Sequence, residues 1–216
     1  MSENNRILKT DDLEYVKNRY NRRIEQHGAT FESLNSGNWE KQEARYQVHT
    51  NAIVTENAHV LDIGCGLGMY YQYLNQKGVM VKYTGYDIMQ PYIDTANEHF
   101  SEATFECRNI FEEGIEGKFD TIVMSQVLNN KYKKSDNEKV MKEAIKLAFE
   151  HSNVSISIDM MSNYVDYKNE DLYYYSPESI FEYAKSLTRR VSLRHDYRAF
   201  EFCIQLFHGN HGGFVQ

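Results

Sequence analysis

The segment Val60-Leu-Asp-Ile-Gly-Cys-Gly-Leu-Gly68 decides the fold, because a short apolar run ends in three closely spaced glycines. The apolar run indicates a buried strand, and the glycines indicate a tight turn into a helix. The next predicted strand ends in Tyr83-Thr-Gly-Tyr-Asp87, which places an acid about 20 residues beyond the turn, where ribose hydroxyls are usually bound. A glycine-rich turn without a ligand is the alternative, and the acid counts against it. The two segments together predict a nucleotide-type site at the carboxyl ends of parallel strands.

Strands and helices alternate along the rest of the chain. We expect strands at 60–63, 79–86, 103–108, 119–124 and 154–158, helices at 67–75, 91–100, 137–150 and 177–187, and closing strands at 190–194 and 200–207. This alternation predicts an α/β fold in which helices cover both faces of a parallel sheet. The two closing strands are joined too closely for a helical crossover, so they should pair antiparallel.

Two amphipathic helices are expected before the first strand. Residues 11–27 keep helical spacing, with Asp11 and Glu14 resembling a capping box, and a second helix runs from Trp39 to about residue 54. We therefore divide the chain into an N-terminal helical cap, residues 1–55, and a sheet domain, residues 56–216.

Composition excludes several classes of protein. The 216 residues carry a net charge of -7, which argues against a general nucleic-acid binder, whose affinity comes largely from Lys and Arg on phosphates. No apolar run is long enough for a membrane span, and the N-terminus lacks the apolar region of a secretory signal. The three cysteines form no C-x-x-C pair, so no metal site is expected. We expect a cytoplasmic protein, and its oligomeric state stays open.

The glycine spacing discriminates among nucleotide cofactors. A dinucleotide site of the G-x-G-x-x-G type would need glycine where Met69 stands, and no G-K-[ST] follows to make a P-loop. The segment from Val60 to Gly68 instead resembles the first motif of class I S-adenosylmethionine-dependent methyltransferases. Tyr86-Asp-Ile88 resembles their second motif, Phe105-Glu-Cys-Arg-Asn-Ile110 the third and Phe119-Asp-Thr-Ile-Val-Met-Ser-Gln-Val-Leu128 the fourth.

The resemblance covers roughly residues 56–208 and carries definite expectations. It implies a Rossmann-like seven-stranded mixed sheet of order 3-2-1-4-5-7-6 with strand 7 antiparallel. It implies S-adenosyl-L-methionine as cofactor and S-adenosyl-L-homocysteine as product. Residues 56–216 would then be the methyltransferase domain.

The same resemblance implies a set of cofactor contacts. Asp87 would accept both ribose hydroxyls, Asp62 would orient the amino group of the cofactor, and Asn109, where an Asp is usual, would meet the adenine amino group through its amide oxygen. Arg45 would pair the cofactor carboxylate, or would belong to a solvated helix face. The implied cofactor-binding residues are Arg45, Asp62, Gly64, Cys65, Gly66, Gly68, Asp87, Ile88, Asn109, Ile110 and Gln126.

Candidates for the acceptor side follow the later strands. His195, Asp196 and Tyr197 lie in the connection between the closing strands, and His195 suits proton removal near neutral pH. A structural role for His195 at a strand end is the alternative. The candidate substrate contacts are Asn129, Tyr132, Asn163 and Tyr174; the alternatives are a surface loop and aromatic filler.

Missing signatures narrow the substrate class. No D/N/S-P-P-Y/F/W follows the fourth strand, which counts against methylation of amino groups on nucleic-acid bases. We expect methyl transfer to oxygen or nitrogen of a small-molecule acceptor. The segment from Tyr173 to Phe202 also resembles small bacterial methyltransferases of surface-glycan or secondary-metabolite pathways. The alternatives are a protein or nucleic-acid methyltransferase and a non-catalytic S-adenosylmethionine-binding protein.

Overall fold

The computed structural model describes residue 3 and residues 6–34 and 37–209. Within the two predicted units, residues 1–2, 4–5 and 35–36 of the cap and 210–216 of the sheet domain lie outside the described residues. The part of the chain that is described contains no helix long and apolar enough to cross a membrane.

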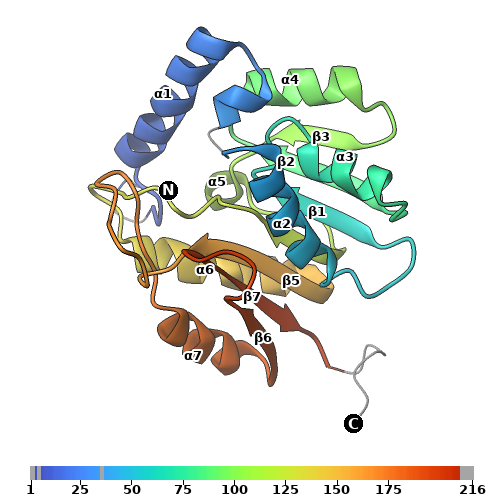
Figure 1. Ribbon diagram of the computed structural model, residues 1–216, viewed down its shortest axis with the longest axis vertical. Helices are drawn as coiled ribbons and strands as arrows, with labels where there is room; N and C mark the ends of the chain where they lie inside the picture. Colours follow the sequence, from blue (N-terminus) through green and yellow to red (C-terminus); the bar gives the residue numbers. More distant parts are fainter. Residues whose placement is uncertain (1–2, 4–5, 35–36, 210–216) are drawn as a thin grey trace.

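The strands form one sheet with helices before, between and after them (Figure 1). The strands are β1 (His59–Ile63), β2 (Lys82–Asp87), β3 (Thr104–Cys107), β4 (Phe119–Met124), β5 (Ser152–Met161), β6 (Arg190–Arg194) and β7 (Glu201–Phe207). The helices are α1 (Thr10–His27), the short 3-10 turn η2 (Phe31–Leu34), α2 (Trp39–Thr50), α3 (Met69–Gln76), α4 (Gln90–His99), α5 (Ile110–Glu113), α6 (Asn137–His151) and α7 (Pro177–Leu187).

The strand order is β3-β2-β1-β4-β5-β7-β6, which confirms the predicted topology. Strands β1 to β5 run parallel, and β7 pairs antiparallel with β5 and with β6. The order reverses between β1 and β4, where an open α/β sheet leaves a crevice at its carboxyl edge.

Apolar clusters on the two faces of the sheet hold the helices in place. Side chains of α2, α3 and α4 pack on one face with Val60 and Tyr83, whereas α5, α6 and α7 pack on the other with Ile156 and Phe202. Because helices cover both faces of the sheet, nearly every residue of β4 is buried, and its sequence does not alternate between apolar and polar residues.

Several element boundaries differ from the prediction for local reasons. Helix α3 begins at Met69 rather than 67, because Gly66 and Gly68 have φ of 52° and 74° and cannot continue a helix. Strand β5 extends to Met161, since β7 pairs with it along its whole outer end. The predicted capping box of α1 is wrong: Lys9 is the N-cap residue and makes no side-chain cap.

Candidate functional site

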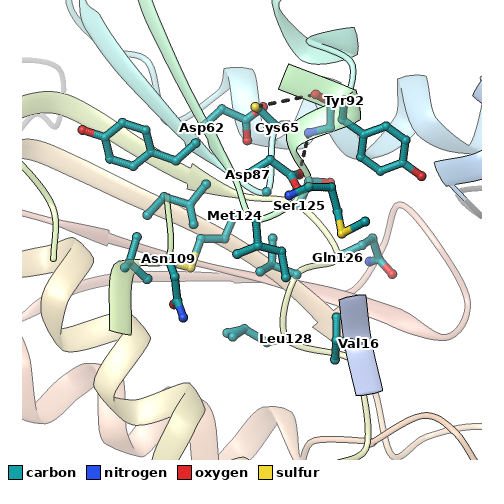
Figure 2. A pocket seen from close by; sticks show the side chains of 18 of the residues that line it. Val16, Asp62, Cys65, Asp87, Tyr92, Asn109, Met124, Ser125, Gln126 and Leu128 are labelled. Atoms are coloured by element: carbon teal, nitrogen blue, oxygen red, sulfur yellow. Dashed lines mark hydrogen bonds between the residues drawn. The ribbon is translucent and has the colours of Figure 1, made fainter. Parts of the chain in front are cut away.

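A cavity of about 160 Å³ opens at the carboxyl ends of β1, β2 and β4 (Figure 2). Four of the segments expected to bind the cofactor meet there: the glycine loop, the end of β2, the turn before α5 and the turn after β4. Helix α1 closes the remaining side with Leu13, Val16 and Tyr20, so the cavity is walled by the cap as well as by the sheet. We call this the first cavity.

The glycine loop has no room for side chains at its turns. Gly64 has φ of 79°, and a Cβ there would collide with the side chain of Val127; a Cβ at Gly66 would lie 2.8 Å from Leu34. The backbone N–H groups of Gly64 and Cys65 both donate to the carbonyl of Tyr86, at 2.7 and 3.0 Å. The loop is therefore fastened to the end of β2, beside Asp87.

Asp87 lies at the base of the loop. Its carboxylate accepts from the backbone N–H of Gly66 and of Met89, each at 2.9 Å, and burial raises its pKa. These bonds fix the carboxylate at the rim of the first cavity, where Ile88 also lines the wall.

Asp62 is a second acid in the first cavity and is only 3% exposed. Burial raises its pKa to about 6, although a hydrogen bond of 2.5 Å from the Tyr83 hydroxyl opposes the shift. A positively charged group placed against Asp62 would hold it ionised, because opposite charges favour each other.

Asn109 presents a donor rather than the expected acceptor. Its amide oxygen accepts from the backbone N–H of Phe111 at 3.1 Å, which caps α5, and its Nδ2 is buried without a hydrogen-bond partner among the described residues. A buried N–H₂ group facing a cavity needs a partner, and an acceptor nitrogen of a purine ring supplies one. The site therefore fits an adenine ring, with Ile110 forming the adjacent wall.

A second cavity of about 180 Å³ adjoins the first. Tyr20, Leu34, Gln126 and Asn130 line both, so the two cavities share one wall. The other lining residues of the second cavity are Arg19, Arg45, Asn129, Met161, Leu172 and Glu201. Two arginines, three amides and one carboxylate thus make up most of its lining.

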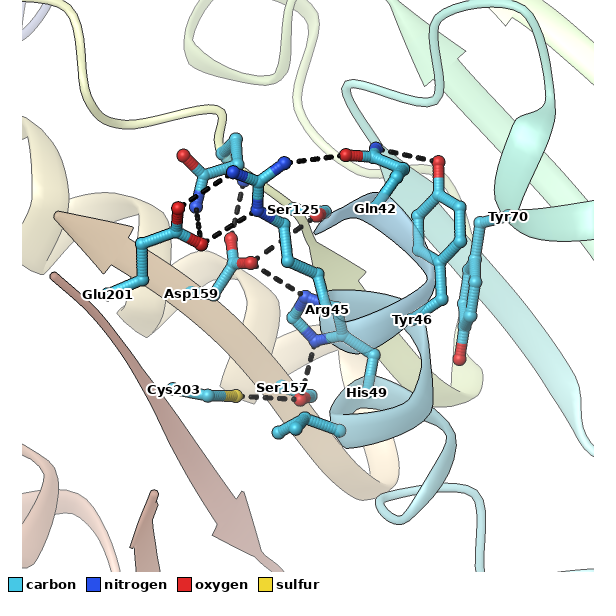
Figure 3. A network of polar contacts seen from close by, with 12 residues as sticks. Gln42, Arg45, Tyr46, His49, Tyr70, Ser125, Ser157, Asp159, Glu201 and Cys203 are labelled. Atoms are coloured by element: carbon cyan, nitrogen blue, oxygen red, sulfur yellow. Dashed lines mark hydrogen bonds and ion pairs between the residues drawn. The ribbon is translucent and has the colours of Figure 1, made fainter. Parts of the chain in front are cut away.

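Arg45 is held in the wall of the second cavity (Figure 3). Its guanidinium donates to both carboxylate oxygens of Glu201 at 2.7 Å and to Gln42 at 2.7 Å. The Arg45 and Glu201 side chains are 7% and 5% exposed, and such a bidentate pair is geometrically rigid. The structure thus joins Arg45 to Glu201 and places it outside the lining of the first cavity.

His49 belongs to the same network and was missed from the sequence. It is fully buried, with Nδ1 2.8 Å from the Ser157 hydroxyl and Nε2 3.5 Å from the Asp159 carboxylate. Burial alone would lower the pKa of His49, but the carboxylate raises it to about 10, and the imidazolium in turn lowers the pKa of Asp159. The available signal was its spacing of four residues from Arg45, which puts both on one helix face.

Asp159 links this charge to the turn after β4. Its carboxylate accepts from the backbone N–H of Gln126 at 2.6 Å. Gln126 has φ of 61°, a left-handed conformation that is uncommon for a residue with a side chain. The network therefore holds a strained residue in the wall between the two cavities.

The three candidate catalytic residues make separate contacts, and none of them lines either cavity. His195 packs near Tyr164 and Phe202, with ring centroids 6.1 and 6.2 Å away, and lines neither cavity. Asp196 is exposed and forms a bidentate pair with Arg194 at 2.7 and 2.9 Å. The hydroxyl of Tyr197 is buried without a hydrogen-bond partner among the described residues. Burial, Asp159 and Glu201 raise its pKa, so Tyr197 stays protonated and can act as a donor.

The candidate substrate residues separate in the same way. Asn129 lines the second cavity, where its Nδ2 donates to Gln126 at 2.8 Å, and Tyr132 lines the first. Asn163 is exposed, and the hydroxyl of Tyr174 accepts from the backbone N–H of Asn169 at 2.8 Å. The structure brings Asn129 and Tyr132 to the cavities and leaves Asn163 and Tyr174 outside both linings. Among the described residues, no group of three His, Cys, Asp or Glu side chains is arranged to hold a metal ion.

Comparison with known proteins agrees with this geometry. A family model described as a methyltransferase domain matches residues 54–192. The chain is 29% identical over 151 residues to the candidate methyltransferase Rv1506c of Mycobacterium tuberculosis, covering 66% of this chain and 89% of that protein.

Solved structures share the fold at low sequence identity. Magnesium protoporphyrin IX methyltransferase from Synechocystis PCC 6803 with bound SAH gives a TM-score of 0.65 at 13% identity, over 92% of this chain and all of that one. The DhpI-SAM-HEP complex gives 0.67 at 13%, over 92% and 98% of the two chains. The plantazolicin methyltransferase BpumL with SAH and a desmethyl analogue gives 0.60 at 12%, over 88% of each.

Proposed function

The chain belongs to the class I S-adenosylmethionine-dependent methyltransferases, and from this membership we propose that the first cavity holds the cofactor and the second holds a small-molecule acceptor, methylated at oxygen or nitrogen. The observation that carries this proposal is the wall shared by the two cavities at Gln126. Methyl transfer is an in-line displacement, so the donor and the acceptor need adjoining sites. Relatives that act on protoporphyrin and plantazolicin support an organic acceptor of this kind.

Three polar groups of the first cavity are assigned to the cofactor. The Asp87 carboxylate accepts from the ribose hydroxyls, the buried Nδ2 of Asn109 donates to a ring nitrogen of the adenine, and Asp62 pairs with the amino group. Gly64, Cys65 and Gly66 line the remaining wall, where the absence of side chains at the glycines lets the backbone approach a ligand closely.

The bound cofactor supplies an electrophilic methyl group, and the protein supplies position and a dry environment. Leu13 and Val16 of α1 cover the first cavity with apolar surface, which excludes water from the reacting groups. The Asp159 bond fixes the backbone of Gln126, and the side chain of Gln126 reaches Asn129 and Glu201 in the second cavity. Orientation of this kind supplies roughly 7–11 kcal/mol of barrier lowering.

Of the three catalytic candidates, the geometry favours Tyr197. Its charged neighbours Arg45, Asp159 and Glu201 belong to the network beside the second cavity, whereas His195 and Asp196 contact other groups. Since its pKa is raised, we assign Tyr197 the role of a protonated group of this network rather than of a base; like His195 and Asp196, it lines neither cavity. His195 and Asp196 remain proposals from the sequence.

The cofactor assignment is tested by thermal unfolding with S-adenosylhomocysteine. At a concentration of 100 times its Kd, the ligand stabilises the protein by about 2.7 kcal/mol, which raises Tm by roughly 5–10 °C for a chain of this size. Asp87→Ala should abolish most of that shift, and the exposed Asp94→Ala on the neighbouring helix should leave it intact. No shift for the wild-type protein would overturn the assignment. A screen of small acceptors with labelled cofactor then separates an enzyme from a binding protein.

A further inference from the structure

The open hydrogen-bonding groups of the second cavity are donors. The carboxylate that lines this cavity, Glu201, already accepts hydrogen bonds from the protein. Arg45 donates to both of its oxygens, Arg198 donates at 3.3 Å and Gln126 donates at 3.5 Å. The amide oxygen of Asn129 accepts from the backbone N–H of Met161 at 2.9 Å. The acceptor groups of this wall are therefore taken by the protein itself.

Arg19 differs from the other arginine of the cavity. Its Nη1 donates to the amide oxygen of Asn130 at 3.1 Å, and no carboxylate among the described residues forms an ion pair with it. The Asn130 bond holds the guanidinium against the wall and uses one of its five N–H donors. A guanidinium kept in a cavity with most of its donors open matches the fork geometry of an oxyanion.

The charges around the second cavity also favour an anionic ligand. The Glu201 carboxylate is neutralised by Arg45, and the Asp159 carboxylate behind it by His49. Of the charged residues that line the second cavity, Arg19 is left without a balancing carboxylate, so the cavity is positive in a chain of net charge -7. Local positive charge within an acidic protein attracts anions to that place rather than to the surface at large.

We propose that the acceptor carries a carboxylate or phosphate group and that Arg19, positioned by Asn130, binds it in the second cavity. This inference rests on the proposed function, because it assigns the acceptor of that same site. Arg19 lies on α1, whose residues Leu13 and Val16 cover the first cavity. One helix would thus contribute both the cover of the cofactor and the charge that selects the acceptor.

The test uses the full chain saturated with S-adenosylhomocysteine and three small probes of similar size: benzoate, phenyl phosphate and neutral benzamide. Ligand-observed NMR titration gives the Kd of each probe. We expect at least one of the two anions to bind the wild-type protein at least tenfold more tightly than benzamide, and the stronger of them identifies the group.

Arg19→Gln should weaken the binding of that anion at least tenfold, because a hydrogen bond to a charged group is lost together with the charge. Arg19→Lys keeps the charge and should retain part of the affinity. Arg22→Gln is the matched control: it removes the same charge from the same helix, but Arg22 is exposed and, within the described part of the chain, donates to the carbonyl of Asn18 alone.

Equal binding of anions and benzamide would overturn the proposal, as would equal weakening by Arg19→Gln and Arg22→Gln. In either case, bound S-adenosylhomocysteine would leave the proposed function standing. Failure of S-adenosylhomocysteine to bind the wild-type protein would instead overturn the proposed function, and this assignment of its acceptor with it.

Discussion

Gln126 has a left-handed backbone and lines both cavities. The residues that hold its backbone therefore shape both cavities, even where they do not line the first. Asp159 accepts the Gln126 N–H, and His49 keeps Asp159 ionised from the opposite side. Neither of these two interactions joins neighbours in the sequence. They act together because β4, β5 and α2 meet at this point.

Replacing His49 tests how much this buried charge contributes. His49→Gln leaves Asp159 without its cation and should lower the free energy of unfolding by roughly 3–5 kcal/mol near pH 6. The folded-state pKa of about 10 exceeds the unfolded value, so the contribution is fully present below about pH 6.5 and is lost as pH rises through 10. Denaturant unfolding at several pH values should therefore show the cost shrinking toward pH 10. The exposed His99→Gln is the control, and a cost independent of pH would contradict a charged His49.

The ionisation of Asp62 should make the affinity for S-adenosylhomocysteine depend on pH. Its pKa of about 6 means that the free protein holds it protonated at pH 5 and ionised at pH 7. In the site proposed above, the ionised form of Asp62 pairs with the ligand amino group, so S-adenosylhomocysteine affinity should rise roughly tenfold from pH 5 to pH 7. Calorimetric titration of the wild type and of Asp62→Asn measures this. The variant should bind weakly with a flatter profile; an unchanged slope would assign the dependence to another group.

At the scale of elements, α1 is anchored by one carboxylate. Asp12 is 2% exposed and accepts from three successive backbone N–H groups, those of Lys133, Lys134 and Ser135. Burial alone would raise the pKa of Asp12, but these bonds and the Ser135 hydroxyl lower it overall. The loop after β4 thereby fixes the helix that covers the first cavity.

Asp12→Ala should loosen this cover. We expect a loss of about 2–3 kcal/mol in the free energy of unfolding and a three- to tenfold loss of S-adenosylhomocysteine affinity, since the closed form becomes less populated. Asp11→Ala is the matched control, because the neighbouring Asp11 is exposed and its ion pair among the described residues is with the Lys134 side chain. Reduced stability with unchanged affinity would show that α1 does not cover the ligand.

Most elements could be predicted because their signals are local. Apolar periodicity predicted α6, and the bounds predicted for α7, which begins at Pro177, agree with the structure at both ends. The glycines and Asp87 predicted the position of the cofactor loop. Helix α5 was not predicted, because four residues are too few to show a helical period. Its sequence signal is the N-cap residue Asn109. The network beside the second cavity was also missed: Arg45 and Glu201 are 156 positions apart, and no local pattern relates them.

At the scale of the whole molecule, the cap and the sheet share one interior. The Tyr46 ring of α2 lies 5.1 Å from that of Tyr70 in α3, and the Arg45 and His49 charges are the partners of Glu201 and Asp159 in the sheet. The predicted boundary at residue 55 lies in the connection between α2 and β1, and we predict that the two parts do not fold separately.

Truncation checks this prediction. A chain beginning at residue 56 should lose cooperative unfolding, because the buried Asp159 would lose its partner His49 and Glu201 its bidentate partner Arg45. A chain beginning at Gly28 keeps α2 and should stay folded, with weaker S-adenosylhomocysteine binding because α1 is missing. Circular dichroism during heating distinguishes the two. A cooperative transition for the shorter chain would show that the sheet domain is independent.

The pairing of Arg45 with Glu201 also sets an order of events during synthesis. Glu201 leaves the ribosome 156 residues after Arg45, which corresponds to roughly 10–30 s at ordinary elongation rates. Until then Arg45 lacks its bidentate carboxylate partner, and the wall of the second cavity is incomplete. The wall of the second cavity is thus completed by β7, so this cavity forms only after that strand has been synthesised.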